Sequence, residues 1–250
     1  MKNVIISIPA RLDSTRFPSK LCAKINQVPI IQLVFDVANK CGADVTVIAD
    51  HHMHEFCQSL GLSSVCVDGD YSSGTDRIAS WVNSHNVSDD VLVVNVQGDE
   101  PAINSKNITH LIESMIASPE ANIGTLYHSS LQSINDPSKV KVVCNHMGYA
   151  LYFSRSLIPY CVNQSSPVIY KYHIGIYAYR AKWLKQWPSL VQADLSSVES
   201  LEQLKILESG QNIHMFEAVC EHYHGVDTPE DLQSLQNSWQ EWWPYDSLVT

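Results

Sequence analysis

The sequence has little positive charge and no long hydrophobic run. Its 250 residues include 16 Lys and Arg against 26 Asp and Glu, which gives a formal net charge of −10. A general nucleic-acid binder needs a basic face to neutralise phosphates, so we expect no nucleic-acid partner. No apolar stretch approaches the roughly 20 residues that span a bilayer, and the apolar run at 4–8 is too short for a signal sequence. We therefore expect a cytoplasmic protein without membrane insertion.

Several catalytic and structural motifs are also missing. The seven cysteines form no C-x-x-C pair, and their odd number is not typical of a secreted disulfide framework. The chain contains no Walker A loop, G-x-G-x-x-G, G-x-S-x-G or H-E-x-x-H. These absences remove the main support for a P-loop ATPase or a dinucleotide oxidoreductase. A hydrophobic fraction of 45% is nevertheless ordinary for a folded globular protein.

Short apolar runs alternate with amphipathic segments in the first half of the chain. The runs that predict strands are 4–8, 44–49, 64–67 and 91–96. The segments that predict helices are 30–40, 51–60 and 75–84. This alternation is typical of βαβ units and a mainly parallel sheet, so we expect the ligand site at the carboxyl ends of the strands.

The pattern changes after about residue 120. The segments that predict strands there are 123–127, 140–144, 149–153, 173–179 and 213–218. The spacing of Leu201, Leu204 and Leu207 predicts one amphipathic helix over 197–209. A last helix is expected after Thr228, which suits an N-cap, with Pro229 at the first helical position.

The loop after the first strand is the first candidate site. Arg11, Arg16 and Lys20 place three cations within ten residues, directly after a buried strand. A triphosphate needs several cations that converge on it, so the loop is a candidate for phosphate binding. The alternative is an exposed basic loop that has no ligand.

Carboxylates at strand ends form the second candidate. The apolar run before residue 97 ends in Gln97-Gly98-Asp99-Glu100, and Asp227 stands just before the expected cap of the last helix. Mg²⁺ is typically held by one or two carboxylates together with substrate phosphates. Taken alone, Asp99 is also interpretable as the cap of the next helix, and the segment around Asp227 as a plain helix start.

Two further patterns carry less weight. Ser73 and Gly74 open a helix, and such an N-terminus suits a ligand that approaches the backbone closely. His51, His52 and His54 form an H-H-x-H run, for which an exposed helix start is favoured over a transition-metal site. His222 and His224 are likewise interpreted as part of a solvated loop.

Taken together, eight stretches resemble the motifs of 3-deoxy-manno-octulosonate (KDO) cytidylyltransferases, in the family's order and over nearly the whole chain. They are IPAR-x-x-STR-x-P-x-K at 8–20, SGTDR at 73–77, NVQGDEP at 95–101, VKVV at 140–143, GYALYFSR at 148–155, HIGIYAYR at 173–180, SLEQLKILESG at 200–210 and GVDTPEDL at 225–232. None is decisive alone, but eight in order are highly specific.

The resemblance implies an α/β nucleotidyltransferase fold with a Rossmann-like, mixed and mainly parallel sheet flanked by helices. It implies one domain over 1–250, in which a smaller antiparallel part at about 123–200 binds the sugar and forms a homodimer. The reaction implied is transfer of CMP from CTP to the anomeric hydroxyl of KDO, with release of pyrophosphate and with Mg²⁺ as cofactor. The product would supply lipopolysaccharide biosynthesis.

The resemblance also implies residue roles. The implied catalytic residues are Arg11, Lys20 and Asp99. The implied nucleotide contacts are Ala10, Arg11, Lys20, Ser73, Gly74 and Gln97. The implied sugar contacts are Arg16, His173, Glu202 and Gln203, and the implied metal ligands are Asp99 and Asp227.

Some positions depart from the family pattern. Ser19 and Leu21 flank Lys20 where the family has glycine and proline, the loop at 160–166 is short and uncharged, and Tyr172 replaces an arginine. Fewer cations near an acidic sugar favour either a modified sugar such as 8-amino-KDO or ordinary KDO that is bound more weakly. A cytidylyltransferase for another acidic sugar, such as a nonulosonate, and a non-catalytic nucleotide-binding paralogue also stay open.

Overall fold

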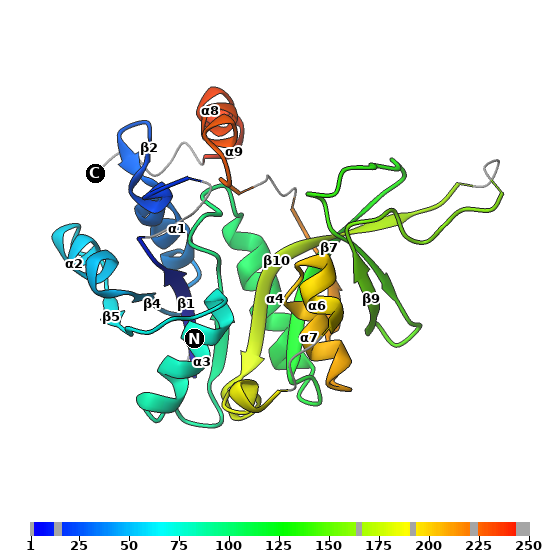
Figure 1. Cartoon of the computed structure of the whole chain (residues 1–250), viewed down its shortest axis with the longest axis horizontal. Coiled ribbons are helices and arrows are strands. Elements are labelled where there is room, and N and C mark those ends of the chain that lie inside the picture. The colour runs from blue at the N-terminus through cyan, green and yellow to red at the C-terminus, as the bar shows by residue number, and fades with distance from the viewer. Residues whose placement is uncertain (1–2, 13–16, 164–166, 191–193, 221–224, 244–250) are drawn as a thin grey trace.

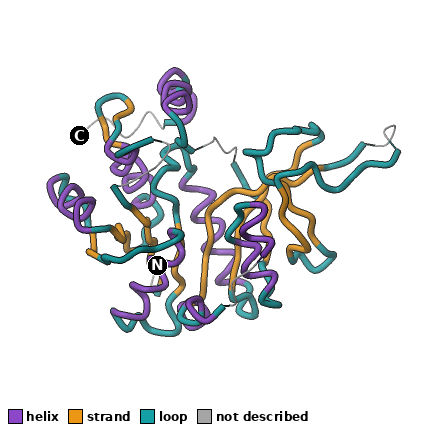
Figure 2. Tube along the Cα trace, in the orientation of Figure 1, coloured by secondary structure: helices purple, strands orange, loops and turns teal. Residues whose placement is uncertain are grey.

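A single large sheet organises the molecule (Figures 1 and 2). The computed structural model describes residues 3–12, 17–163, 167–190, 194–220 and 225–243. The strands along the sheet follow the order β11-β7-β10-β6-β1-β4-β5, and β8 and β9 branch from β10. Their bounds are β1 Val4–Ala10, β4 Asp44–Ala49, β5 Ser64–Cys66, β6 Leu92–Asn95, β7 Ile123–Ser130, β8 Lys141–Cys144, β9 Ala150–Ser154, β10 Tyr170–Arg180 and β11 His214–Glu217.

Strand direction divides this sheet into two halves. β1 pairs in parallel with β4 and β6, and β4 pairs in parallel with β5. β10 runs antiparallel to β6, β7 and β8, whereas β11 is parallel to β7. The predicted α/β class with a mixed, mainly parallel sheet and a smaller antiparallel part is therefore confirmed.

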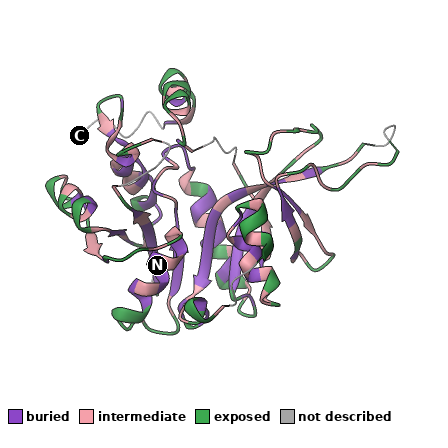
Figure 3. Ribbon diagram, viewed as in Figure 1, coloured by how far each residue is buried: buried purple, intermediate pink, exposed green. Residues whose placement is uncertain are grey.

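Helices cover both faces of the sheet. On one face lie α1 (Ile30–Asn39), α2 (His51–Ser59) and α4 (Ser105–Ala117). On the other lie α3 (Gly74–Ser84), α5 (Ala181–Leu184) and α7 (Gln203–Glu208). The central strands are buried on both sides, which explains why they consist of nearly continuous apolar runs (Figure 3). The remaining elements are η1 Lys20–Cys22, β2 Lys24–Ile25, β3 Val28–Pro29, η2 Trp187–Ser189, α6 Asp194–Glu199, α8 Pro229–Asn237 and α9 Trp239–Trp242.

The single helix predicted over 197–209 is wrong. The chain forms α6 and α7 instead, with Ser200 between them at a φ of 51°. The guanidinium of Arg155 donates to the carbonyls of Glu199 and Ser200. In a continuous helix, these carbonyls would accept from backbone N–H groups instead. The leucine spacing continues across this break, so the periodicity alone does not reveal it.

The helix after Thr228 is confirmed. The Thr228 side chain accepts from the backbone N–H of Asp231, and the Asp231 carboxylate accepts from the backbone N–H of Thr228. This reciprocal capping box fixes where α8 begins. Asp227 is thereby held at a defined place directly before the helix.

The segment between β7 and β10 projects away from the packed layers, to the right in Figure 1. It carries several large apolar side chains that are exposed: Leu131, Met147, Leu151, Tyr160, Val162 and Ile169. The limits of a sugar-binding part at about 123–200 stay a prediction, since β7 and β10 belong to the same continuous sheet as β1. Among the helices described, none combines the length and apolar character that crossing a bilayer requires.

Candidate active site

A cavity of about 270 Å³ lies at the carboxyl ends of β1 and β6 and beside the N-terminus of α3. This is the edge where open α/β sheets bind ligands. Predicted nucleotide contacts and metal ligands form much of its wall. Those that line it are Ala10, Arg11, Lys20, Ser73, Gly74, Gln97, Asp99 and Asp227. Residues far apart in the sequence are thus brought together in one place.

Lys20 joins the two predicted metal ligands. Its Nζ forms an ion pair with Asp99, lies 3.3 Å from Asp227 Oδ1 and donates to the carbonyl of Val226 at 3.2 Å. The Lys20 side chain is 15% exposed, compared with 30% for Asp99 and 51% for Asp227. The two carboxylates therefore face one cation at the wall of the cavity.

The alternative in which Asp99 caps the next helix is wrong. Asn104 is the N-cap of α4, and its side chain accepts from the backbone N–H of Lys106 at 2.9 Å. The Asp99 carboxylate is instead directed to Lys20. Its position at the end of an apolar strand therefore serves the cavity.

Close backbone contacts hold the walls in place. The backbone N–H of Val226 donates to the carbonyl of Asp99 at 2.8 Å. A Cβ added at Gly225 would lie 2.8 Å from that carbonyl oxygen, and one at Gly74 would lie 2.8 Å from Cγ of Pro9. Larger residues at these glycines would push apart the segments that carry Asp99, Asp227 and Ser73.

Glu100 adds a third carboxyl group that the sequence pattern did not single out. Burial of its carboxyl, together with the negative charges of Asp99 and Asp227, raises the pKa of Glu100 to about 8. A carboxyl with this pKa is largely neutral at pH 7, so the negative charge at this corner of the cavity belongs to Asp99 and Asp227, and the ammonium of Lys20 offsets part of it. Such a corner favours a cation.

The N-terminus of α3 forms the opposite wall. Ser73 and Asp76 make a capping box, in which the Ser73 hydroxyl accepts from the backbone N–H of Asp76 at 3.1 Å. Arg77, which the sequence analysis gave no role, lines the cavity beneath Tyr71, with its guanidinium 4.9 Å from the ring centroid. Its Nη1 donates to the carbonyl of Val67 at 2.5 Å. The SGTDR motif contained this residue, but its burial follows from the fold.

A second cavity of about 640 Å³ shares Asp99 and Asp227 with the first. His173 of β10 lines it, and its Nε2 lies 3.1 Å from Thr125 Oγ1. Lys139 also lines this cavity and supplies a cation that the sequence analysis missed. The two cavities therefore meet at the paired carboxylates.

The structure describes two of the other predicted sugar contacts, Glu202 and Gln203. Glu202 accepts a hydrogen bond from Thr75, and burial raises the pKa of Glu202. Gln203 is 5% exposed, and neither residue is among the described residues that line the two cavities. Arg16 falls outside the described residues, as do His222, His224 and the loop from 164 to 166. Their roles stay predictions.

Tyr172 shows what has replaced the family's arginine. Its ring is buried, and its hydroxyl donates to the carbonyl of Gln132 at 2.7 Å and accepts from the backbone N–H of Ile134 at 2.8 Å. The side chain therefore anchors the 132–134 segment beside the second cavity. It brings no positive charge there.

The fold and the paired cavities define a nucleotidyltransferase of the α/β class. A family model described as cytidylyltransferase matches residues 4–213. The 3-deoxy-manno-octulosonate cytidylyltransferase of Alteromonas mediterranea is 39% identical over 242 residues, which cover 92% of this chain and 97% of that protein. The protein of the same name from Francisella tularensis subsp. tularensis is 39% identical over 94% of this chain and 98% of its own length. The chain belongs to the 3-deoxy-manno-octulosonate cytidylyltransferase family.

Solved structures agree with this assignment. The structure of a CMP:2-keto-3-deoxy-manno-octonic acid synthetase complexed with CTP has a TM-score of 0.88 and 36% identity, and covers 96% of this chain and 99% of that one. A cytidylyltransferase from Leptospira borgpetersenii has a TM-score of 0.62 at 15% identity, covering 97% of this chain and 88% of that one. The second likeness supports the fold alone.

Proposed function

We propose that this enzyme transfers CMP from CTP to the anomeric hydroxyl of KDO, releases pyrophosphate and so supplies the activated sugar for lipopolysaccharide biosynthesis. The observation that carries the proposal is the meeting of two cavities at Asp99 and Asp227. The names of the relatives support CTP and KDO as substrates. No observation favours 8-amino-KDO, a nonulosonate or a non-catalytic role.

The geometry suggests how the substrates are arranged. CTP occupies the first cavity, where Arg11 and Lys20 bind its phosphates, and the acidic sugar occupies the second. The sugar hydroxyl then attacks the α-phosphorus near the shared wall, opposite the departing pyrophosphate. Transfers of this kind depend on positioning and charge neutralisation, which the converging cations supply.

We also propose Mg²⁺ as the cofactor. Asp99 and Asp227 fit this ion because both are oxygen ligands and both already contact one cation, the ammonium of Lys20. Asp99 and Asp227 would hold the ion, which would supply charge neutralisation at the phosphates and a lower pKa for the attacking hydroxyl. Lys20 would then act on the phosphates.

Lys139 offers an explanation for sugar binding despite the neutral loop and Tyr172. Lys139 lines the second cavity together with Tyr172 and His173. A cation there suits the carboxylate of an acidic sugar. We propose that Lys139 contributes charge that other members of the family place elsewhere.

We propose a homodimer formed through the projecting segment. Its exposed apolar side chains, such as Leu151 at 60% and Ile169 at 62% exposure, would be covered by a second copy. Sedimentation equilibrium tests the dimer, and an Ile169→Asp variant is expected to sediment as a monomer.

We also propose a cytoplasmic location for the enzyme, which the proposed substrate CTP favours.

The experiment that tests the activity measures pyrophosphate release from CTP and KDO in the presence of Mg²⁺. Release that requires all three components supports the proposal, and CMP-KDO is the product expected in the same reaction. Release with a nonulosonate in place of KDO, and none with KDO, would contradict the choice of sugar. No release with any acidic sugar by the folded protein would contradict the proposed activity.

A further inference from the structure

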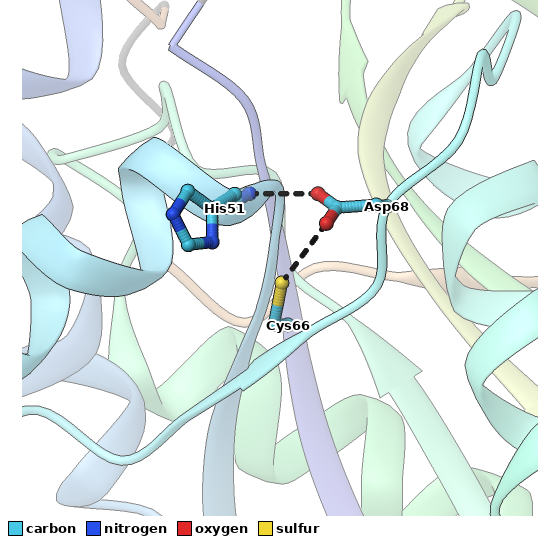
Figure 4. Close-up of side chains that lie close together, drawn as sticks. All are labelled: His51, Cys66 and Asp68. Atoms are coloured by element: carbon cyan, nitrogen blue, oxygen red, sulfur yellow. Dashed lines mark hydrogen bonds between the residues drawn. The ribbon is translucent and has the colours of Figure 1, made fainter.

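Three different kinds of metal-binding side chain meet outside the active site. They are the imidazole of His51, the thiol of Cys66 and the carboxylate of Asp68, and one ligand atom of each lies within 4.8 Å of the other two (Figure 4). In the sequence, His51 is part of an H-H-x-H run. The structure instead groups it with residues from a neighbouring strand and loop.

Local structure holds the three residues together. β4 and β5 pair in parallel with Ala49 opposite Cys66, so α2 and the loop after β5 begin side by side. Oδ1 of Asp68 accepts from the backbone N–H of His51 at 2.8 Å, and Oδ2 accepts from the Cys66 thiol at 3.5 Å (Figure 4). The loop is therefore tied to the first residue of α2.

A second carboxylate lies near the ring of His51. Its Nε2 lies 3.4 Å from Oε1 of Glu55, one helical turn further along α2. Figure 4 shows one ring nitrogen of His51 on the side towards Cys66 and Asp68. Histidines that bind metals commonly donate their other ring N–H to a carboxylate in this way.

The donor set selects the kind of ion. Imidazole and thiolate are preferred by zinc and other late transition metals, whereas Mg²⁺ prefers oxygen ligands alone. We propose that His51, Cys66 and Asp68 bind a divalent transition-metal ion of the zinc class, at a site separate from Asp99 and Asp227. None of the three is among the described residues that line the nucleotide cavity.

Binding requires the Cys66 thiol to lose its proton. Burial, the hydrogen bond to Asp68 and the charges of Asp68 and Asp50 raise the pKa of Cys66. Coordination would release one proton to solvent as the sulfur–metal bond forms. The carboxylates that disfavour the thiolate attract the ion.

The test uses Co²⁺ as a spectroscopic substitute for Zn²⁺. Chelator-treated protein is titrated with Co²⁺, and thiolate-to-cobalt charge-transfer absorption is followed. We expect one equivalent to produce this absorption and one equivalent of Zn²⁺ to remove it. Cys66→Ser should abolish the absorption, and His51→Ala and Asp68→Asn should each weaken Co²⁺ binding by about tenfold or more.

The controls separate this site from other groups in the chain. Cys144→Ser and His85→Ala remove the same side-chain types elsewhere and should retain the absorption. Excess Mg²⁺ and the variant Asp99→Asn should leave it unchanged as well. Absence of the absorption in the wild-type protein, or its persistence in folded Cys66→Ser, would overturn the proposal. Either result would leave pyrophosphate release with Mg²⁺ as an independent measure of the proposed activity.

Discussion

The two cavities share Asp99 and Asp227 but are built differently. The walls of the nucleotide cavity come from the ends of parallel strands and from α3, and glycines allow these segments to approach within van der Waals contact. The walls of the second cavity come from β10, from the connection before β8 and from α8. The difference suggests that nucleotide binding depends on a fixed backbone arrangement, whereas sugar binding depends on side chains of longer connections that are open to substitution.

Loss of a carboxylate that both cavities share should impair the nucleotide cavity and the second cavity together. This change therefore has the largest expected effect on activity. Asp99→Asn and Asp227→Asn should each lower kcat by about a hundredfold or more, because a lost metal ligand costs several kcal/mol of transition-state stabilisation. Steady-state kinetics at saturating Mg²⁺ measures the effect. Asp89→Asn, at an exposed ion pair with Lys185, should retain activity. Near wild-type turnover in either folded active-site variant would contradict a shared metal site.

Removing a cation from the nucleotide cavity should affect the use of CTP and leave sugar binding in the second cavity unchanged. Lys20→Ala and Arg11→Ala should each lower kcat/KM for CTP by about tenfold to a hundredfold, because charge develops on the departing pyrophosphate. The KM for the sugar should change little. Lys24→Ala, at an exposed position of β2, is the matched control. An effect confined to the sugar KM would remove both residues from the nucleotide site.

Removing a cation from the second cavity should weaken sugar binding and leave CTP binding unchanged. Lys139→Ala should raise the KM for KDO by about tenfold, because a charge-assisted hydrogen bond to a carboxylate contributes roughly 1.5–3 kcal/mol. The KM for CTP should stay the same. Lys182→Ala on α5 is the control, since this exposed lysine is not among the residues lining either cavity. Equal changes in the KM values for KDO and CTP would contradict a role of Lys139 in sugar binding alone.

The difference in how the two cavities are built also explains how much of the site could be predicted from the sequence. Residues of the nucleotide cavity stand in compact motifs at strand ends and helix starts, so their positions in the sequence placed Asp99 and Ser73 among the candidates. The place of Lys139 in the second cavity and the burial of Glu100 became visible only when distant segments were packed together. Tyr172 looked like a lost charge, yet its hydroxyl satisfies two backbone groups of a neighbouring segment.

The fold shows a similar limit. Strands such as β4 were predicted with their bounds, because buried parallel strands have unmistakable apolar runs. α4 was missed although it supplies several buried side chains to the core, including Ile108 and Leu111. The break between α6 and α7 depends on Arg155, which lies more than forty residues earlier and cannot be found by local periodicity.

The smallest effect is expected from a change at Glu199, beside the break between α6 and α7. It concerns stability, because Glu199 is not among the described residues that line either cavity. Burial opposes ionisation of Glu199, but hydrogen bonds from the backbone N–H of Arg155 and from Ser154 outweigh it and hold the pKa of Glu199 below its ordinary value. A lowered folded-state pKa stabilises the protein above the unfolded-state pKa, and this stabilisation is lost as the pH falls through the folded-state value.

The variant Glu199→Gln should therefore lower the free energy of unfolding by roughly 1 kcal/mol or less at neutral pH, since solvent screens the partly exposed carboxylate. The difference from wild type should shrink as the pH falls below the ordinary pKa of glutamate. Urea unfolding across this pH range measures it, with Glu113→Gln on the exposed face of α4 as the control. Because Glu199 accepts from Ser154 and Arg155 at the end of β9, kcat and both KM values should stay at wild-type levels. A difference that grew towards acid pH would contradict the assigned direction, and a changed sugar KM would tie this junction to the second cavity.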